Sequence, residues 1–214
     1  MEKNLSYSSL SGKLLQVAWL SIVLGLGMEV LLLGIAAGFK NSVSVQTIIA
    51  DTVQKISWST IVCMGVAVGT AAGKMRAQAM GLAGLIAAPL AFHIAKVLHK
   101  STSQALSIAG TASAGGPSPF LLAGLKGLEY AVLGFVLGQV EKNAGGIGKY
   151  MLAGLIIGVI FGGGIVYLTV SMAAKPMPLV GIISRSVNEI IFPVGCSMVI
   201  YTAQKLGEKN KSGR

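Results

Sequence analysis

The sequence predicts an all-α fold: a polytopic integral membrane helix bundle with about six transmembrane helices in one domain, residues 1–214. The chain is 53% hydrophobic and 11% charged, less than half of the charged share of about 25% in soluble domains. Its mean hydropathy is +0.75. Apolar runs of about 20 residues recur, the length that a helix needs to cross a bilayer, whereas a transmembrane β-barrel shows alternating segments of about ten residues.

The first predicted span covers residues 14–38 and could be mistaken for a secretory signal. Such a signal has an apolar core of about 7–15 residues. This run is longer and contains Glu29, so we expect the segment to be retained as a transmembrane helix. Cleavage near Ala36 would leave five spans.

Five further apolar runs follow. They cover about 56–73, 79–98, 119–140, 150–170 and 179–204. Ser118 followed by Pro119 is a favourable N-cap and first-turn pair, so it marks the start of the fourth span. Pro89 and Pro193 lie inside the third and sixth spans and predict kinks, which bilayer helices tolerate when neighbours satisfy the freed carbonyl groups.

Basic residues favour one orientation. With the N-terminus in the cytoplasm, the inner side holds more Lys and Arg than the outer side, as the positive-inside rule requires. The inner residues are Lys3, Lys13, Lys74, Arg76, Lys142, Lys149, Lys205, Lys209, Lys211 and Arg214. The last four form a basic tail, 205–214, suited to anionic lipid headgroups. We therefore expect cytoplasmic termini in the bacterial inner (plasma) membrane, and we attribute the net charge of +10 to this topology rather than to nucleic-acid binding.

The predicted loops differ in length between the two sides. The outer loops, 39–55 and 101–118, are longer than the inner loops, 74–78 and 141–149. The second outer loop is rich in Ser, Ala and Gly, which predicts a flexible segment.

A weak internal repeat is consistent with three helical hairpins in tandem. LAGL recurs at 82–85, 122–125 and 152–155. Aligning the second and sixth spans places Lys55 with Arg185 and Ser59 with Glu189. Transporters commonly contain such repeats, but chance similarity among Gly-rich and Leu-rich helices explains the same pattern, so both explanations stay open.

Glycines four residues apart predict tight helix packing, either within the bundle or in an oligomer. Residues four apart share one helix face, and without side chains there a neighbouring backbone approaches closely. These glycines are Gly65, Gly69, Gly73, Gly134, Gly138, Gly154, Gly158 and Gly162. The run 162–164 also predicts a break or hinge in the fifth span, because each glycine weakens a helix by about 1 kcal/mol relative to alanine.

Charged side chains inside the predicted spans form the candidate site. Lys126 and Glu129 are three residues apart, and Arg185 and Glu189 are four apart, so each pair can meet on one helix face. An unpaired charge at a helix centre costs about 2.5–3.5 kcal/mol on insertion, and an opposite charge lowers that cost. Glu29 is the fifth charge. Counting along the spans at about 1.5 Å per residue places the three glutamates at similar depth in the outer half of the membrane.

The sixth span carries a polar stripe at spacings of three and four. Its members are Gly181, Ser184, Arg185, Asn188, Glu189, Phe192, Gly195 and Cys196. The opposite side is apolar apart from Ser186, so the helix is expected to face protein or water on one side and lipid on the other. Residues 190–203 alone are too few to cross a bilayer, which keeps the stripe inside the membrane. Asn188 therefore joins Arg185 and Glu189 as a candidate binding residue.

Three interpretations of these charges stay open. The charges lock the bundle through ion pairs and hydrogen bonds, or they line a binding site or pathway for an ion, proton or small solute. The third interpretation is that long side chains near a helix end reach back to the membrane surface, which fits Lys126 and Arg185 better than the glutamates.

Signatures of enzymes and metal sites are missing from the sequence. There is no phosphate-binding loop, HExxH or GxSxG motif, so we expect no catalytic activity and no cofactor. Cys63 and Cys196 lie inside spans without a CxxC pattern and are expected to be small buried residues. His93 and His99 are six residues apart, which is not a metal-ligand spacing, so we expect no metal.

The first functional hypothesis is a small membrane transporter or channel for an ion or small solute, acting as a homo-oligomer in the lipid bilayer. Its polar site would be lined by Glu29, Lys126, Glu129, Arg185, Asn188 and Glu189. The alternative is a non-transporting structural or accessory subunit of a larger membrane protein complex, supported by the glycine-rich faces and by the lack of a soluble domain. The sequence indicates no particular substrate.

Overall fold

A computed structural model describes the backbone of residues 2–108, 116–143 and 145–212, with side chains from Ser11 to Gly207. Within these ranges all regular secondary structure is helical, as the all-α prediction expects. The described part contains five helical segments long and apolar enough to cross a membrane. They are Ser11–Gly38, Val45–Ala105, Pro119–Lys142, Ile147–Ser171 and Leu179–Gly207.

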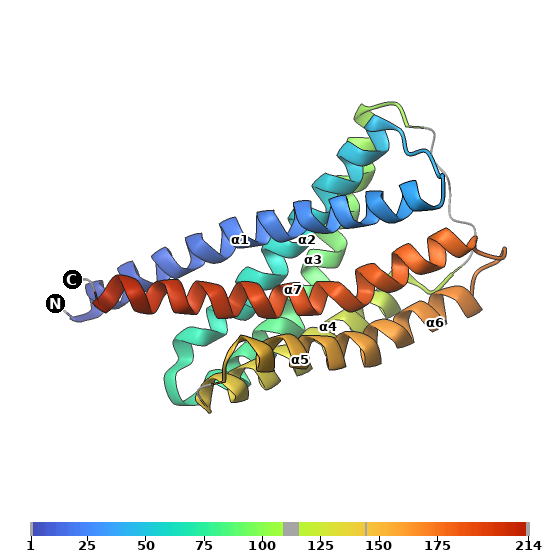
Figure 1. The fold of residues 1–214 in the computed structure, drawn as a ribbon. Helices are drawn as coiled ribbons and strands as arrows, with labels where there is room; N and C mark the ends of the chain where they lie inside the picture. Colours follow the sequence, from blue (N-terminus) through green and yellow to red (C-terminus); the bar gives the residue numbers. More distant parts are fainter. Residues whose placement is uncertain (1, 109–115, 144, 213–214) are drawn as a thin grey trace.

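The helices form an elongated bundle (Figure 1). In chain order they are α1 Glu2–Gly38, α2 Val45–Val68, α3 Arg76–Ala105, α4 Pro119–Lys142, α5 Ile147–Ile157, α6 Gly163–Ser171 and α7 Leu179–Ser212. A 3-10 segment, η1 Gly69–Met75, joins α2 to α3, and a π-helical turn, η2 Gly158–Gly162, joins α5 to α6. The first part of α1 lies beside the last part of α7, at the same end of the bundle as η1 (Figure 1).

Helix α2 begins earlier than the sequence predicts. It starts at Val45, so the second half of the predicted outer loop 39–55 is helical. The Ser44 side chain accepts a hydrogen bond from the backbone N–H of Thr47 at 3.2 Å and caps the helix. The sequence does not predict this part of the helix, because polar residues interrupt the apolar pattern. The Ser44 cap and packing against α1 stabilise it. By contrast, the predicted cap of α4 is confirmed, because Ser118 accepts from Leu121 N at 3.2 Å.

Two other predicted segments differ from the structure or lie partly outside it. Helix α7 continues to Ser212, so the backbone of the predicted basic tail is helical for most of its length. The side chains of Lys209, Lys211 and Arg214 lie outside the described residues. The same is true of residues 109–115 in the predicted flexible loop 101–118, whose first residues belong to α3.

The long segment Val45–Ala105 reverses its direction at Gly73. Gly73 has a φ of 55°, a left-handed conformation that glycine adopts without strain. Gly65 of α2 faces α3 at Ala87, and Gly69 faces it at Met80, so the two helices run antiparallel. A Cβ on Gly73 would meet no described atom within 4 Å. The prediction that Gly73 continues the packing face is therefore wrong, because this residue makes the turn.

The remaining glycines of the predicted faces lie where helices of this chain cross. In α4, Gly134 and Gly138 face the backbone of Met80 and Ala77 in α3. On the other side of the bundle, Gly154, Gly158 and Gly162 face α7 at Val194, Ile190 and Glu189, respectively. A methyl group at any of these positions would overlap with the facing helix, so the backbones approach as closely as glycine allows.

The fifth predicted span does not break at its glycine run. Gly163 begins α6 with right-handed helical angles, φ −58° and ψ −43°, and the path from α5 to α6 stays helical. The irregularity is the π-helical turn η2, which ends at Gly162. The predicted break is therefore wrong, because a wider turn accommodates the close approach of α7 without interrupting the helix.

Pro193 lies inside α7 and leaves one backbone carbonyl without a helical partner. A proline has no N–H to donate, so the carbonyl four residues earlier, that of Glu189, is freed. Gly162 of η2 lies against this oxygen, since a Cβ on Gly162 would be 2.7 Å from it. The glycine Cα–H is placed to act as a weak donor to the carbonyl. The same arrangement recurs in α3 and α4 with Pro89, Leu85 and Gly127.

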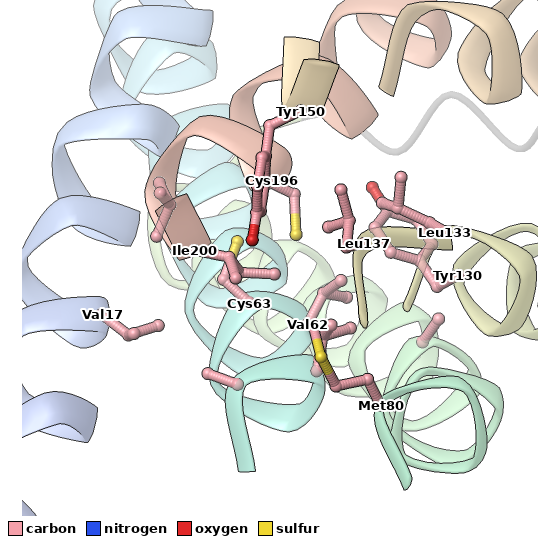
Figure 2. Close-up of a cluster of buried hydrophobic side chains, with 14 of the residues drawn as sticks. Val17, Val62, Cys63, Met80, Tyr130, Leu133, Leu137, Tyr150, Cys196 and Ile200 are labelled. Atoms are coloured by element: carbon pink, nitrogen blue, oxygen red, sulfur yellow. The ribbon is translucent and has the colours of Figure 1, made fainter. Parts of the chain in front are cut away.

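An apolar core fills the middle of the bundle (Figure 2). It joins α1, α2, α3, α4, α5 and α7 through residues that include Val17, Val62, Met80, Leu137, Tyr150 and Ile200. Cys63 and Cys196 belong to this core and are 1% and 0% exposed, as expected of small buried residues.

Candidate solute-binding cavity

Lys126 is the centre of a buried charge cluster between α4 and α7. Its Nζ donates to Glu129 Oε2 at 2.7 Å on the same helix and forms an ion pair with Glu189 of α7. Lys126 is 6% exposed and Glu129 is 0% exposed. The Lys126–Glu129 pair expected from their spacing is therefore present, and a second carboxylate from another helix shares the same ammonium group.

Arg185 does not form the predicted pair with Glu189. The Glu189 carboxylate contacts Lys126 instead, and no carboxylate among the described residues lies within ion-pair distance of Arg185. The interaction across helices prevails because opposite charges attract more strongly where protein excludes water. Both side chains line the same cavity, but Lys126 is only 6% exposed, whereas Arg185 is partly exposed.

Glu29 has a separate partner. Its carboxylate lies 2.5 Å from Lys55 Nζ, and this ion pair joins α1 to α2. The sequence placed Glu29, Glu129 and Glu189 at one depth, and the structure brings only the last two onto one lysine. Lys55 was not among the predicted site residues because it fell at the end of a predicted loop, although its alignment with Arg185 pointed to it.

A cavity of about 560 Å³ opens next to these charges. Residues of α1, α2, α3, α4, α6 and α7 line it, together with residues just before α4 and α7. The polar lining consists of Gln54, Lys55, Lys96, Lys126, Thr169, Ser184, Arg185, Asn188 and Glu189. Of the predicted site residues, Lys126, Arg185, Asn188 and Glu189 therefore face one space, while Glu29 and Glu129 lie behind their lysine partners.

The charge on the cavity wall is strongly biased. Among its described lining residues, four are basic and one, Glu189, is acidic. Lys55 and Lys126 are held by carboxylates, whereas Lys96 and Arg185 have no described carboxylate partner. The positive charges of Lys96 and Arg185 are close enough to repel each other. Lys96 was missed in the sequence because it lies near a span end, where a surface lysine is ordinary.

Apolar and aromatic side chains form the rest of the wall. They include Leu32, Trp58, Phe92, Leu122, Met177 and Phe192. The Lys96 Nζ lies 4.8 Å from the centroid of the Phe92 ring, and the Lys126 Nζ lies 5.7 Å from that of Trp58. Aromatic faces attract cations at these distances, so the two rings help to position the two ammonium groups.

Two polar atoms beside the charge cluster lack hydrogen-bond partners within the described structure. They are Glu129 Oε1 and the Tyr130 hydroxyl, both fully buried. A buried polar group without a partner is costly, so such groups are rare and concentrate at functional sites or next to bound water. Both residues lie beside Lys126: Glu129 is its ion-pair partner, and the Tyr130 ring centroid lies 5.9 Å from the Lys126 Nζ.

A second polar network closes the opposite end of the bundle. Arg76, at the start of α3, forms an ion pair with Glu141 near the end of α4. Gln204 of α7 donates to Glu141 Oε2 at 2.8 Å and accepts from the Tyr150 hydroxyl at 3.1 Å. The predicted inner loops contain Arg76 and Glu141, and Tyr150 and Gln204 lie at the ends of predicted spans, so the sequence does not single them out. Along α3, α4 and α7, the apolar core lies between this network and the cavity.

The described residues contain no group of three or more His, Cys, Asp or Glu side chains arranged to hold a metal ion. His99 Nε2 lies 3.0 Å from Asp51 Oδ1, which ties the end of α3 to the start of α2. Comparisons with protein-family models, with curated proteins and with solved structures found no match to this chain. The functional interpretation therefore depends on the geometry and charge of the cavity itself.

Proposed function

We propose that the protein is a small integral membrane transporter or channel for an ion or small solute. The observation that carries this proposal is the cavity of about 560 Å³, in which charged residues from α2, α3, α4 and α7 face one space. Charged side chains within apolar spans are costly and usually mark a pathway or binding site. The volume lies within the range of about 300–1,000 Å³ that is typical of small-molecule sites.

The topology that fits this function has six membrane crossings with both termini in the cytoplasm. The 61-residue segment Val45–Ala105 would measure about 90 Å as one straight helix, three times the hydrocarbon thickness of about 30 Å. Its reversal at Gly73 divides it into two helices that can each cross the bilayer. The cavity then opens toward the outer side, and the network around Glu141 lies toward the cytoplasm.

The arrangement corresponds to a state that is open on one side. A solute in the cavity would be separated from the cytoplasm by the apolar core and by the Arg76–Glu141–Gln204–Tyr150 network. Passage through the bundle requires the helices to move apart at the apolar core and also at this network. The ion pair and hydrogen bonds of this network are exchangeable contacts between α3, α4, α5 and α7, so they suit a closure that opens and reforms.

A non-transporting accessory subunit is the alternative. Its main support in the sequence is the set of glycine faces, which are suited to contact with a partner helix. Apart from Gly73, those glycines face helices of this chain, so they provide no argument for a partner protein. Purification in mild detergent followed by mass spectrometry separates the two functions: stoichiometric recovery with a larger complex supports the alternative, and a lone homo-oligomer supports transport.

The decisive test is flux into proteoliposomes that contain the purified protein. Light scattering after an osmotic step would be recorded with potassium chloride, phosphate, acetate and benzoate and with neutral glycerol. Glu189→Gln and Arg185→Gln should each abolish the protein-dependent flux while expression and oligomer size stay unchanged. Lys100→Gln, an exposed charge one turn beyond Lys96, serves as the matched control and should transport normally. If both site variants merely fail to assemble, the charges lock the bundle and the proposal is wrong.

A further inference from the structure

We propose that the cavity binds a small organic anion, with its carboxylate or phosphate group between Lys96 and Arg185. The inference deepens the transport proposal and rests on it for the passage step, but binding itself is independent of passage. It begins from the bias of the cavity wall, where one acidic side chain faces four basic ones among the described residues.

The acidic member of the wall is already occupied. Glu189 contacts Lys126, and Lys126 also holds the buried Glu129. A cation entering the cavity would therefore have to displace an ammonium group that two carboxylates hold. It would also approach three further positive charges, those of Lys55, Lys96 and Arg185. Cation binding is disfavoured on both counts, because like charges repel strongly in a space that protein partly shields from water.

The basic members of the wall differ in their availability. Lys55 is held by Glu29 at 2.5 Å, and Lys126 is held on two sides. Lys96 and Arg185 have no carboxylate partner in the described structure and repel each other. An anionic group placed between them would remove this repulsion and accept charge-assisted hydrogen bonds from both. A guanidinium group in particular matches a carboxylate or phosphate with two parallel hydrogen bonds.

The remainder of the lining indicates an organic rather than an inorganic anion. Trp58, Phe92 and Phe192 offer aromatic surface, and Leu32, Leu122 and Met177 offer aliphatic surface. Gln54, Ser184 and Asn188 add neutral polar side chains along the wall. A ligand with an acidic group and an apolar body would contact both kinds of surface. A hydrated inorganic ion would leave the apolar part of the wall uncovered.

Two sources could supply this chemistry: a free organic anion in solution or the headgroup of an anionic lipid. Both present a carboxylate or phosphate next to an apolar body. The cavity lies among helices that are expected to contact lipid, so both sources can reach it. Binding measurements on lipid-free and lipid-bearing protein distinguish them.

Trp58 provides a built-in probe of the cavity. The chain has two tryptophans, and the other one, Trp19, is 64% exposed on α1. In a Trp19→Phe background, the fluorescence of Trp58 reports on the cavity alone. The purified protein in neutral detergent would be titrated with benzoate, its neutral analogue benzamide and its cationic analogue benzylamine. Inorganic phosphate would be the inorganic comparison, and nanodiscs of phosphatidylglycerol or phosphatidylcholine would test the lipid source.

Benzoate should change the Trp58 signal saturably, while benzamide, benzylamine and phosphate bind at least tenfold more weakly. Arg185→Gln and Lys96→Gln should each weaken benzoate binding by roughly tenfold or more, the scale of one charge-assisted hydrogen bond. Lys100→Gln should bind benzoate as the unmodified protein does. If phosphatidylglycerol nanodiscs shift the signal and abolish benzoate binding, the anion is a lipid headgroup; if benzoate still binds there, the anion comes from solution.

Other results would overturn the inference. Equal binding of benzamide and benzoate would show that the cavity recognises the apolar body alone, and preference for benzylamine would show a cation site. If Lys100→Gln lowered benzoate affinity as much as Lys96→Gln does, the affinity would depend on the overall positive charge of the surface and not on the cavity. The outcome for transport is separate. Anion binding without flux would support this inference and contradict the transport proposal. Flux selective for cations would support the transport proposal and contradict this inference.

Discussion

At the scale of single residues, Lys126 is the side chain on which most of the site depends. It holds one carboxylate from its own helix and one from α7, and it lies within 6 Å of the ring centroids of Trp58 and Tyr130. A buried ion pair is weak evidence for stability, because desolvation offsets the attraction. Removing one member is different, since it leaves a charge buried without compensation.

Replacing Lys126 with methionine should therefore destabilise the bundle strongly. Two carboxylates would lose their counter-charge, and loss of one partner of a buried pair costs roughly 3–5 kcal/mol. Thermal unfolding in detergent, followed by circular dichroism, measures the effect. Lys100→Met, an exposed change of the same type, should leave the midpoint unchanged. Adding Glu129→Gln and Glu189→Gln to Lys126→Met should restore most of the loss, and a triple variant as unstable as the single one would contradict this account.

At the scale of elements, backbone contact at glycines sets how the helices pack. Helix α4 offers a matched pair of positions. Gly134 faces the backbone of Met80, whereas a Cβ on Gly124 would meet no described atom within 4 Å. Alanine favours helix formation at both positions, by about 1 kcal/mol. The difference in unfolding free energy between the two alanine variants therefore measures the cost of the steric overlap at Gly134.

We expect Gly134→Ala to destabilise the protein and Gly124→Ala to be neutral or slightly stabilising. The added methyl group at Gly134 must push α3 and α4 apart, and overpacking of this kind costs about 1–3 kcal/mol. Unfolding in increasing denaturant, with helical content as the signal, compares the two variants directly. Equal behaviour would mean that the close approach of α3 and α4 is not required for stability.

The π-helical turn η2 allows a second comparison within one stretch of sequence. A Cβ on Gly162 would overlap with Glu189 of α7, whereas Gly164 faces open space among the described residues. Gly162→Ala should lower the unfolding midpoint and, because it displaces Glu189, should also change the fluorescence of Trp58. Gly164→Ala should leave the Trp58 fluorescence unchanged and the unfolding midpoint unchanged or slightly higher. A change of Trp58 fluorescence in Gly164→Ala alone would contradict the proposed contact between η2 and α7.

Sequence reasoning recovered the elements better than the contacts. Length and hydropathy located the five long apolar segments of the described structure, because a helix that crosses a bilayer needs an apolar run of about 20 residues. Helix ends outside those runs were missed: α2 begins at Val45 because of the Ser44 cap, and the polar residues that follow hid it. The glycine run 162–164 predicted a break, whereas the structure has a π-helical turn that ends at Gly162 and a helix that continues from Gly163.

The site was recovered only in part for a physical reason. Spacing along one helix predicts pairs such as Lys126–Glu129, which is present. It says nothing about partners on other helices, so Lys126–Glu189 and Lys55–Glu29 were not predicted and Arg185 was paired with Glu189 in error. Which residue faces which depends on helix rotation, and no pattern in a single sequence fixes that rotation.

At the scale of the whole molecule, the topology determines which face of the bundle each site meets. With the N-terminus in the cytoplasm, six crossings would place the α1–α2 connection outside and both the α2–α3 and α4–α5 connections inside. Five crossings, with Val45–Ala105 as one span, would move the α4–α5 connection to the outer side. The side of the membrane on which the exposed residue Asn143 lies therefore distinguishes the two arrangements.

Single cysteines tested with a membrane-impermeant maleimide distinguish these topologies. Cys63 and Cys196 would first be replaced by alanine, a small change in the buried core. In intact cells Asn41→Cys should react, while Lys74→Cys and Asn143→Cys should react only after the membrane is opened. Labelling of Asn143→Cys in intact cells would refute six crossings. All three positions are exposed in the structure, so each should be labelled in detergent. A failure to label any of them in detergent would contradict the structure at these positions.

Residue 189 joins three helices through two different groups. Its carboxylate contacts Lys126 of α4, and its carbonyl, which lacks a helical donor because of Pro193, lies against Gly162 between α5 and α6. Helix α7 can bend at the proline, so the part of the helix before it can tilt while the part after it stays in the core. Such a tilt would change the position of the Glu189 carboxylate relative to Lys126 and that of Arg185, one turn earlier, relative to Lys96. Bending at this one backbone position would therefore shift Arg185 and Glu189 together.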